Sequence, residues 1–269
     1  SEAAGHLSLP VNNFTLATTI SSAVPFNATI KLRVGNYSVV REALINGSSP
    51  ISFPVAVGFG EYSASITVYG GGAPLASRNF TLTLSPPEIS NVTLSSCGVS
   101  QSLPATTLFP TASISFTAAS VAPVLVNASL AVGGYSFSMP LLLNDSSTVS
   151  ESIQLPLGNS SASISLEYYG EELAAYSSFI IREQPTLSAS YSYGNYTAPL
   201  GNGTEAIVST TYPLSINYRA PNVPGIRVST SFSNGAQGTS IVFGSPGKYA
   251  GQLTLEYGSC SVEFMRFSV

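Results

Sequence analysis

The sequence predicts an all-β protein built from three tandem β-sandwich domains. Segments that alternate apolar and polar residues dominate, rich in Val, Ile, Thr, Tyr and Phe, with Gly, Pro and Asn between them. This is the pattern of short strands and turns in β-sandwiches. Residues 27–34, 163–166 and 252–257 alternate strictly, whereas the spacing of an amphipathic helix is nearly absent. A short sequence that returns three times indicates three domains.

The repeated sequence follows a glycine in each third of the chain. It reads GEYSASITVY from Gly60, GNSSASISLEY from Gly158 and GKYAGQLTLEY from Gly247. A glycine-containing turn and one more apolar segment follow each copy, at residues 79–84, 178–181 and 262–267. Each domain therefore ends with the same pair of strands.

An upstream match supports the repeat. Residues 27–37 align with 127–135, which places Asn27 opposite Asn127, and residues 214–218 form a looser third match. Prolines predict the boundaries, because proline cannot donate to a strand ladder and suits linkers and strand starts. Pro86-Pro87 and Pro185 divide the chain into domains at 1–85, 86–185 and 186–269. Domains of this length suit a sandwich of about seven strands.

Two tyrosines give these domains a resemblance to the immunoglobulin-like fold. Tyr62 and Tyr249, in Gly-x-Tyr before the penultimate strand, resemble the tyrosine corner, whose hydroxyl binds backbone upstream. Ser160 departs from this pattern in the middle domain, and the Trp and intradomain Cys pair of antibody domains are missing. The resemblance implies three tandem immunoglobulin-like β-sandwich domains, and folds of this kind host many functions.

The two cysteines lie in different domains. Cys97 follows the first strand region of the second domain, and Cys260 lies in the last hairpin turn of the third. In an immunoglobulin-like sandwich the first strand runs toward the following domain and that turn faces the preceding one, so the resemblance implies a Cys97–Cys260 disulfide. Two buried free thiols or a bond between subunits are the alternatives. No CxxC motif or neighbouring His supports a catalytic thiol.

The charge composition excludes several classes of function. Only 8% of the residues are charged, about a third of the usual ~25%, whereas 44% are apolar. Disorder needs the opposite combination. A net charge of −4 with nine scattered basic residues argues against nucleic-acid binding.

The residue types that do most chemistry are nearly absent. One His (His6) and two distant Cys cannot form a zinc site. One Asp (Asp145) with scattered Glu argues against a calcium site, although Glu171-Glu172 could bind a cation weakly. A Ser-His-Asp triad would need His6 and Asp145, and we expect His6 in a mobile N-terminal tail. Gly70-Gly71-Gly72 lacks a following Lys-Ser/Thr and indicates a hairpin turn. We therefore predict no enzyme activity, catalytic residue, metal or cofactor.

The start of the chain predicts export. It begins at Ser1 without Met or a basic-plus-apolar leader, which we interpret as a processed, mature, extracellular protein. No run of 18 apolar residues occurs, so we expect no membrane span. The long apolar N-terminal helix of type IV pilins and archaellins is also missing.

Glycosylation motifs are in excess. Eleven of the 15 Asn residues begin an Asn-X-Ser/Thr sequon without a middle Pro, although only 67 of 269 residues are Ser or Thr. We predict N-glycosylation at several of them; the alternative is that Asn and Thr are common in turns and strands. The sequon residues are Asn13, Asn27, Asn36, Asn46, Asn79, Asn91, Asn127, Asn144, Asn159, Asn195 and Asn202.

The low charge predicts tolerance of acid, because acid unfolding acts mostly through paired carboxylates. A surface of neutral polar residues and sugars resembles that of exported proteins of thermoacidophilic archaea.

The first domain is short at its start. Few residues precede Asn13, and residues 7–11 alternate like a strand. One interpretation is a shortened first strand of its own domain. The other is a donor strand, with Leu7, Leu9 and Val11 inserted into the sheet of a neighbouring subunit through backbone bonds. A head-to-tail contact of this kind does not close and builds a filament.

These features together resemble the sugar-coated, donor-strand-linked subunits of archaeal surface threads. The resemblance implies a non-enzymatic structural subunit of an extracellular filament on the cell surface, whose partners are copies of itself. The alternatives are an S-layer component, a monomeric adhesin or carbohydrate-binding module, and an exported hydrolase with Glu as acid and base.

Overall fold

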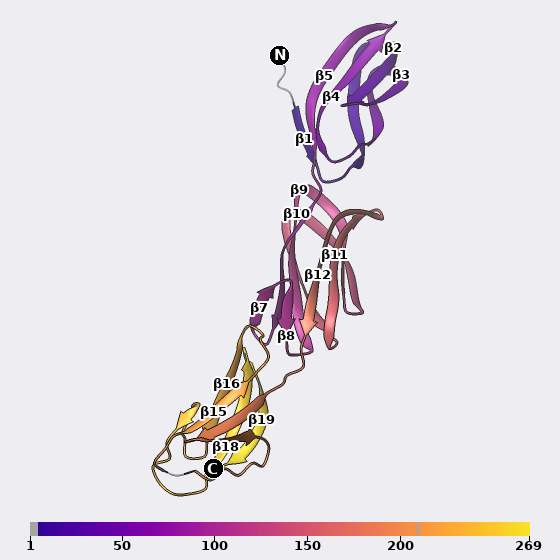
Figure 1. Ribbon diagram of the computed structural model, residues 1–269. Helices are drawn as coiled ribbons and strands as arrows, with labels where there is room; N and C mark the ends of the chain where they lie inside the picture. The colour runs from indigo at the N-terminus through magenta and orange to yellow at the C-terminus, as the bar shows by residue number, and fades with distance from the viewer. Residues whose placement is uncertain (1–4, 209) are drawn as a thin grey trace.

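The computed structural model describes residues 5–208 and 210–269. These residues form strands and connections without any helix, and so without a helix that could span a membrane. Figure 1 shows the strands in three consecutive groups along an elongated molecule, with β1 and β19 in the two outer groups. The protein is all-β, as predicted.

The N-terminal group forms one five-stranded sheet of described residues in the order β1-β5-β4-β2-β3. β1 pairs with β5 in parallel, and the other neighbours are antiparallel. The strands are β1 (Gly5–Leu9), β2 (Asn13–Val34), β3 (Tyr37–Ala56), β4 (Gly60–Gly70) and β5 (Ala73–Leu84).

The middle group has the order β7-β6-β9-β11-β12-β8, with β10 paired to β9. β8 pairs with β12 in parallel, as β1 does with β5. The strands are β6 (Glu88–Ser96), β7 (Val99–Ser102), β8 (Ala105–Thr107), β9 (Thr111–Val132), β10 (Tyr135–Gln154), β11 (Gly158–Tyr168) and β12 (Glu171–Arg182).

The C-terminal group consists of two sheets, β14-β13-β15-β17 and β16-β18-β19. The strands are β13 (Ser188–Tyr193), β14 (Tyr196–Leu200), β15 (Leu214–Arg219), β16 (Ile226–Phe232), β17 (Ser240–Ile241), β18 (Ala250–Tyr257) and β19 (Cys260–Ser268).

β2 and β9 each serve both layers of an immunoglobulin-like sandwich. The first half of β2 pairs with β3 alone, and after a register shift between Ser22 and Phe26 the second half pairs with β3 and β4. A proline stands at each corner, Pro25 and Pro123, where its missing N–H interrupts the ladder. One bent strand therefore supplies two consecutive strands of the sandwich.

The N-terminal and middle groups repeat one another without a gap. Every strand from β2 to β5 begins and ends 98 residues before its counterpart from β9 to β12, for example Asn13–Val34 and Thr111–Val132. In this register Asn127 matches Thr29, so the alignment of Asn27 with Asn127 is wrong by two residues. A shift of two keeps every side chain on the same face of a strand, so alternation alone cannot detect it.

Tyrosine corners occur where the resemblance implies them. Tyr62 Oη donates to Gly58 O at 2.8 Å, and Tyr249 Oη donates to Ser245 O at 2.8 Å. In the middle group Ser160 is buried beside Gly133, where an added Cβ would lie 2.7 Å from Ser160 Oγ. Ser160 therefore stands beside Gly133 where Tyr62 stands beside Gly35 in the N-terminal group.

The C-terminal group divides its strands differently. β15 pairs with β13 and β17, and β16 pairs with β18. The two strands together hold the places of the two halves of β2, with a break at residues 220–225. The match of residues 214–218 to 27–37 is therefore wrong, because β15 corresponds to the first half of β2 and not to the second.

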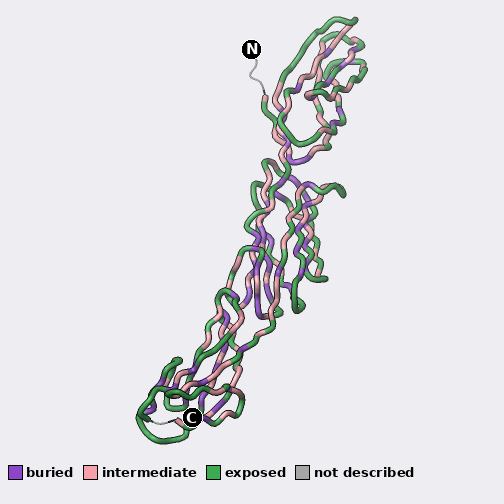
Figure 2. The backbone as a smooth tube through the Cα atoms, viewed as in Figure 1, coloured by how far each residue is buried: buried purple, intermediate pink, exposed green. Residues whose placement is uncertain are grey.

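Burial follows the alternation, and Figure 2 shows buried and exposed stretches alternating along the strands. Buried apolar side chains form a large cluster in each group and a small fourth cluster between the middle and C-terminal groups. The strands break between Leu84 and Glu88 and between Arg182 and Ser188. These breaks are compatible with domains at 1–85, 86–185 and 186–269, which stay a prediction.

Candidate assembly and glycosylation sites

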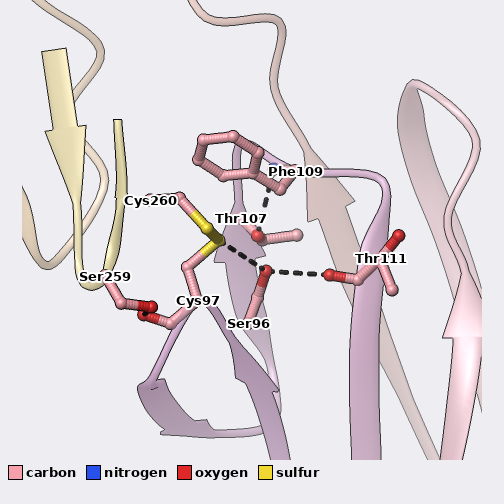
Figure 3. The surroundings of a disulfide bond; sticks show 7 residues. All are labelled: Ser96, Cys97, Thr107, Phe109, Thr111, Ser259 and Cys260. Atoms are coloured by element: carbon pink, nitrogen blue, oxygen red, sulfur yellow. Dashed lines mark hydrogen bonds between the residues drawn. A yellow bond between two sulfur atoms is a disulfide. The ribbon is translucent and has the colours of Figure 1, made fainter. Parts of the chain in front are cut away.

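A disulfide bond joins the middle and C-terminal groups (Figure 3). The Cα atoms of Cys97 and Cys260 are 5.4 Å apart across a sequence separation of 163 residues. Next to the bond, Ser259 donates to Cys97 O from its backbone N at 2.7 Å and from its Oγ at 3.0 Å. The predicted pairing of the two cysteines is confirmed.

Close packing surrounds this bond. Gly258 has φ +56°, and a Cβ there would lie 2.1 Å from Cys97 O, so the position requires glycine. Gln101 Nε2 donates to Tyr257 Oη at 3.1 Å and to Thr106 O at 3.0 Å. The small fourth cluster of Leu108, Val223, Leu255 and Tyr257 fills the junction.

The junction between the N-terminal and middle groups is built differently. Val11 is buried in the core of the middle group, and Phe14 packs against both cores. Beside them lies a groove of about 700 Å³ between residues 9–14 and the adjoining end of the middle group. Its lining includes Leu9, Phe14, Leu125, Asn127, Pro140, Glu167, Tyr168 and Tyr169.

An exposed aromatic side chain stands at the rim of this groove. Tyr169 is 92% exposed and has φ +48°, a backbone conformation that is uncommon for a bulky residue. Its ring meets that of Tyr168 nearly edge-on, with centroids 4.6 Å apart. The sequence analysis missed this pair. Only the correct alignment of the two repeats shows that Tyr168-Tyr169 replaces Gly70-Gly71 in the equivalent turn.

The three residues of the predicted donor strand lie in three environments. Leu9 packs against the N-terminal core, Val11 is buried in the middle core, and Leu7 is 38% exposed. β1 is an edge strand that pairs only with β5 of its own chain. This is the arrangement of a shortened first strand, and donation to a neighbour stays a prediction.

Compared with the middle group, the outer groups lack a neighbouring strand at two places among the described residues. In the middle group, β6 pairs with residues 113–119 of β9. No strand of the N-terminal group occupies the equivalent position beside the first half of β2. In the middle group, residues 135–143 of β10 pair with the second half of β9. No strand of the C-terminal group occupies the equivalent position beside β16, whose outer edge forms one isolated bridge among the described residues, between Ser231 and Gln237. These open edges belong to the two outer groups, and the middle group has both strands.

All eleven sequon asparagines are exposed. Five lie in the N-terminal group or its turns, four in the middle group and two in the C-terminal group, and none follows Asn202. Asn127 Oδ1 accepts from Ser138 Oγ at 3.0 Å, and Asn202 Oδ1 accepts from Arg266 N at 2.9 Å. Both bonds use Oδ1 and not Nδ2, the atom to which an N-linked sugar attaches.

The few residues suited to chemistry are dispersed. No three His, Cys, Asp or Glu residues among those described form a group that could hold a metal ion. The prediction that His6 lies in a mobile tail is wrong. His6 is in β1, where it pairs with Thr81 of β5, and its Nε2 lies 3.0 Å from Ser8 Oγ. Asp145 lies in β10, in a different sheet. Glu171 and Glu172 are exposed at the start of β12. The absence of enzyme activity, metal and cofactor stays a prediction.

Charge pairs contribute little to either junction. The ion pairs among the described residues join Lys248 to Glu205 and Arg266 to Glu263, all in the C-terminal group. The hydrogen bond and positive charge of Lys248 lower the pKa of the Glu205 carboxyl below its ordinary value. The Arg266–Glu263 hydrogen bond and charge attraction raise the pKa of Arg266.

No protein-family model matches the chain, and no curated protein matches its sequence. Among solved structures, the chain is similar to fibronectin(III)-like modules of Clostridium thermocellum CbhA, with 13% identity over 68% of this chain and 92% of that one and a TM-score of 0.27. It is also similar to a bacterial ice-binding adhesin, with 13% identity over 98% and 92% and a TM-score of 0.35. A Ca²⁺-stabilized adhesin of an Antarctic bacterium has 12% identity over 98% and 70% and a TM-score of 0.32. The likeness concerns the fold alone.

Proposed function

We propose that the protein is a glycosylated structural subunit of an extracellular filament, joined head to tail by strand exchange. The observation that carries the proposal is the pair of open sheet edges in the two outer groups, beside a middle group that has both strands. An unpaired strand edge is a template for pairing with another chain. A contact between unlike ends of identical copies does not close, so the assembly grows into a filament.

We assign β1 as the donor and β16 as the acceptor. β1 is five residues long and bonded along one edge, so it can leave β5 while Val11 and Phe14 keep their places at the junction. Added beside β16, it takes the position that residues 135–143 of β10 hold beside β9. The backbone of residues 226–229 on this edge pairs with no strand among the described residues, whereas Thr230 O accepts a hydrogen bond from Gly238 N.

Glycosylation and an extracellular location fit the same proposal. Every sequon asparagine is exposed, and disulfides persist mainly in oxidising compartments outside the cytosol. The combination resembles archaeal surface threads. In this role the protein needs no cofactor and no catalytic residue, and its partner is another copy of itself.

A monomeric adhesin is the second candidate function. The part of the chain after the last sequon exposes large apolar side chains, with Ile207 96%, Tyr212 58% and Val242 57% exposed. A contiguous apolar patch on a polar surface is typical of a binding site, so the adhesin requires that these side chains gather on one face. An S-layer component, which would form a lattice, is the other structural alternative.

A cysteine trap tests the strand exchange. Leu7→Cys together with Ser229→Cys places one thiol on the donor and one on the acceptor, both at exposed positions. We expect a non-reducing gel to separate a ladder of multiples of the subunit mass. The matched control is Leu7→Cys with Ala131→Cys, an exposed position of β9 that β10 and β11 flank on either side, which should give a single band.

Electron microscopy of the same material decides between the candidates. A single band from the first variant in material that forms filaments would overturn the assigned donor and acceptor. A two-dimensional lattice would favour the S-layer component. Dispersed single particles that bind a ligand would favour the adhesin and overturn the filament.

A further inference from the structure

We propose that the groove between the N-terminal and middle groups holds the N-linked sugar of Asn127, with Tyr169 as its stacking surface. This inference rests on the glycosylation that belongs to the proposed function. It adds a specific place for one sugar chain and a structural role for it.

Asn127 lies within the groove that its sugar would fill. Its Cα partners are Pro140 on β10 and Glu167 on β11, and all three residues line the groove. Because the Asn127 side chain is exposed and its Oδ1 is held by Ser138 Oγ, the amide is oriented and Nδ2 can carry a substituent. The occupant is therefore tethered to its own binding site.

Attachment requires an activated glycosyl phosphate as co-reactant. Nδ2 of Asn127 attacks the anomeric carbon of the first sugar, and the bond from that carbon to the phosphate oxygen breaks. The phosphate leaves with the electron pair, and one amide proton passes to a base of the transferase. Nothing is oxidised or reduced.

The walls of the groove suit a short sugar chain. Ligand sites combine mostly apolar walls with a few polar groups in volumes of about 300–1,000 Å³, and this groove measures about 700 Å³. A pyranose ring presents C–H groups on its faces, which pack on exposed rings and alkyl groups such as Tyr169 and Leu125. Its hydroxyls lie around the edge, where the Glu167 carboxylate can accept hydrogen bonds.

The N-terminal group provides a comparison within the molecule. The matching turn has Gly71 at φ +59°, close to the φ of +48° at Tyr169. A side chain in this conformation costs about 1–2 kcal/mol, and the ring of Tyr169 is 92% exposed, so packing within the chain does not account for it. The two-residue turn sets this φ at Tyr169 as it does at Gly71, and a bound sugar would account for an exposed tyrosine where the N-terminal group has glycine.

The sugar would also join two groups of strands. The groove has Val11 and Phe14 on one side, which keep their places when β1 is donated, and Leu125 and Tyr169 on the other. A sugar chain between them contacts both sides and limits bending at this junction.

Tyrosine nitration tests the inference on the full-length glycoprotein from the cells that make it. Tetranitromethane modifies accessible tyrosines, and peptide mass spectrometry measures nitration at each ring and sugar occupancy at each sequon. We expect Tyr169 to react several-fold more slowly than Tyr212, although Tyr212 is only 58% exposed. Asn127→Gln should reverse this order. Ser129→Ala, which removes the sequon but keeps Asn127, should do the same.

Asn36→Gln is the matched control, because it removes another exposed sequon and should leave Tyr169 slow. Fast nitration of Tyr169 in protein that carries sugar on Asn127 would overturn the inference. A bare Asn127 with other sequons occupied would overturn it too and leave the proposed function intact. Bare asparagines at all eleven sequons would contradict the glycosylation in both proposals.

Discussion

The two junctions of this molecule differ in kind. The N-terminal and middle groups have nearly the same backbone, yet the junction between them is the more open of the two. The middle and C-terminal groups are joined by a disulfide, a backbone contact that only Gly258 permits and a buried apolar cluster. The N-terminal and middle groups meet through Val11 and Phe14 beside an open groove. A few residues in turns and connections therefore decide whether two sandwiches are locked together or meet beside an open groove.

The largest effect should follow from breaking the disulfide. Cys97→Ser removes a cross-link between residues 163 apart, and constraint of so long a loop contributes about 4–5 kcal/mol. We expect amide hydrogen exchange to rise in β18 and β19 and to stay unchanged in β4 and β5. Equal protection in β18 and β19 of both proteins would mean that packing alone holds this junction.

A smaller effect should follow from crowding the same junction. Gly258→Ala drives a Cβ against Cys97 O, which we expect to cost about 2–4 kcal/mol. The readout is the rate at which dithiothreitol reduces the disulfide, which should rise. Gly71→Ala is the control, because Gly71 has φ +59° with no other heavy atom within 4 Å of the added Cβ. An equal acceleration in both variants would refute the proposed role of the backbone contact.

Acid should have the smallest effect, and it should leave both junctions closed. The pKa of Glu205 is lowered by Lys248, so its contribution is present above its ordinary pKa and is lost as the pH falls through the lowered value. Both side chains of the Lys248–Glu205 ion pair are highly exposed, so the pair contributes little to the free energy of unfolding. Thermal unfolding at pH 7, 5 and 3 should give nearly the same midpoints. A junction that opens between pH 5 and 3 would contradict the expected tolerance of acid.

The strands and the disulfide could be predicted from the sequence, whereas the alignment of the repeated strands with one another could not. The Gly60 and Gly158 segments carry clear alternation, and Tyr62 and Tyr249 mark equivalent corners. Asn27 and Asn127 were misaligned because strand alternation is blind to a shift of two residues. Residues 214–218 were assigned to the wrong strand because the bend at Pro25 leaves no trace in the alternation of β2. The groove and the Tyr168–Tyr169 pair depend on contacts between residues distant in sequence, which alternation does not encode.

The Cys97–Cys260 bond is also a shortcut for mechanical tension. When the chain is pulled at its two ends, the force crosses directly from one sulfur to the other, and residues 98–259 carry none of it. Unfolded, the segment closed by this bond, whose ends are 163 residues apart in sequence, would lengthen the molecule by about 3.3–3.6 Å per residue, or roughly 540–590 Å. With the bond intact, a stretched molecule can extend only through its N-terminal sandwich, β6 and β19, while the other strands stay folded under load.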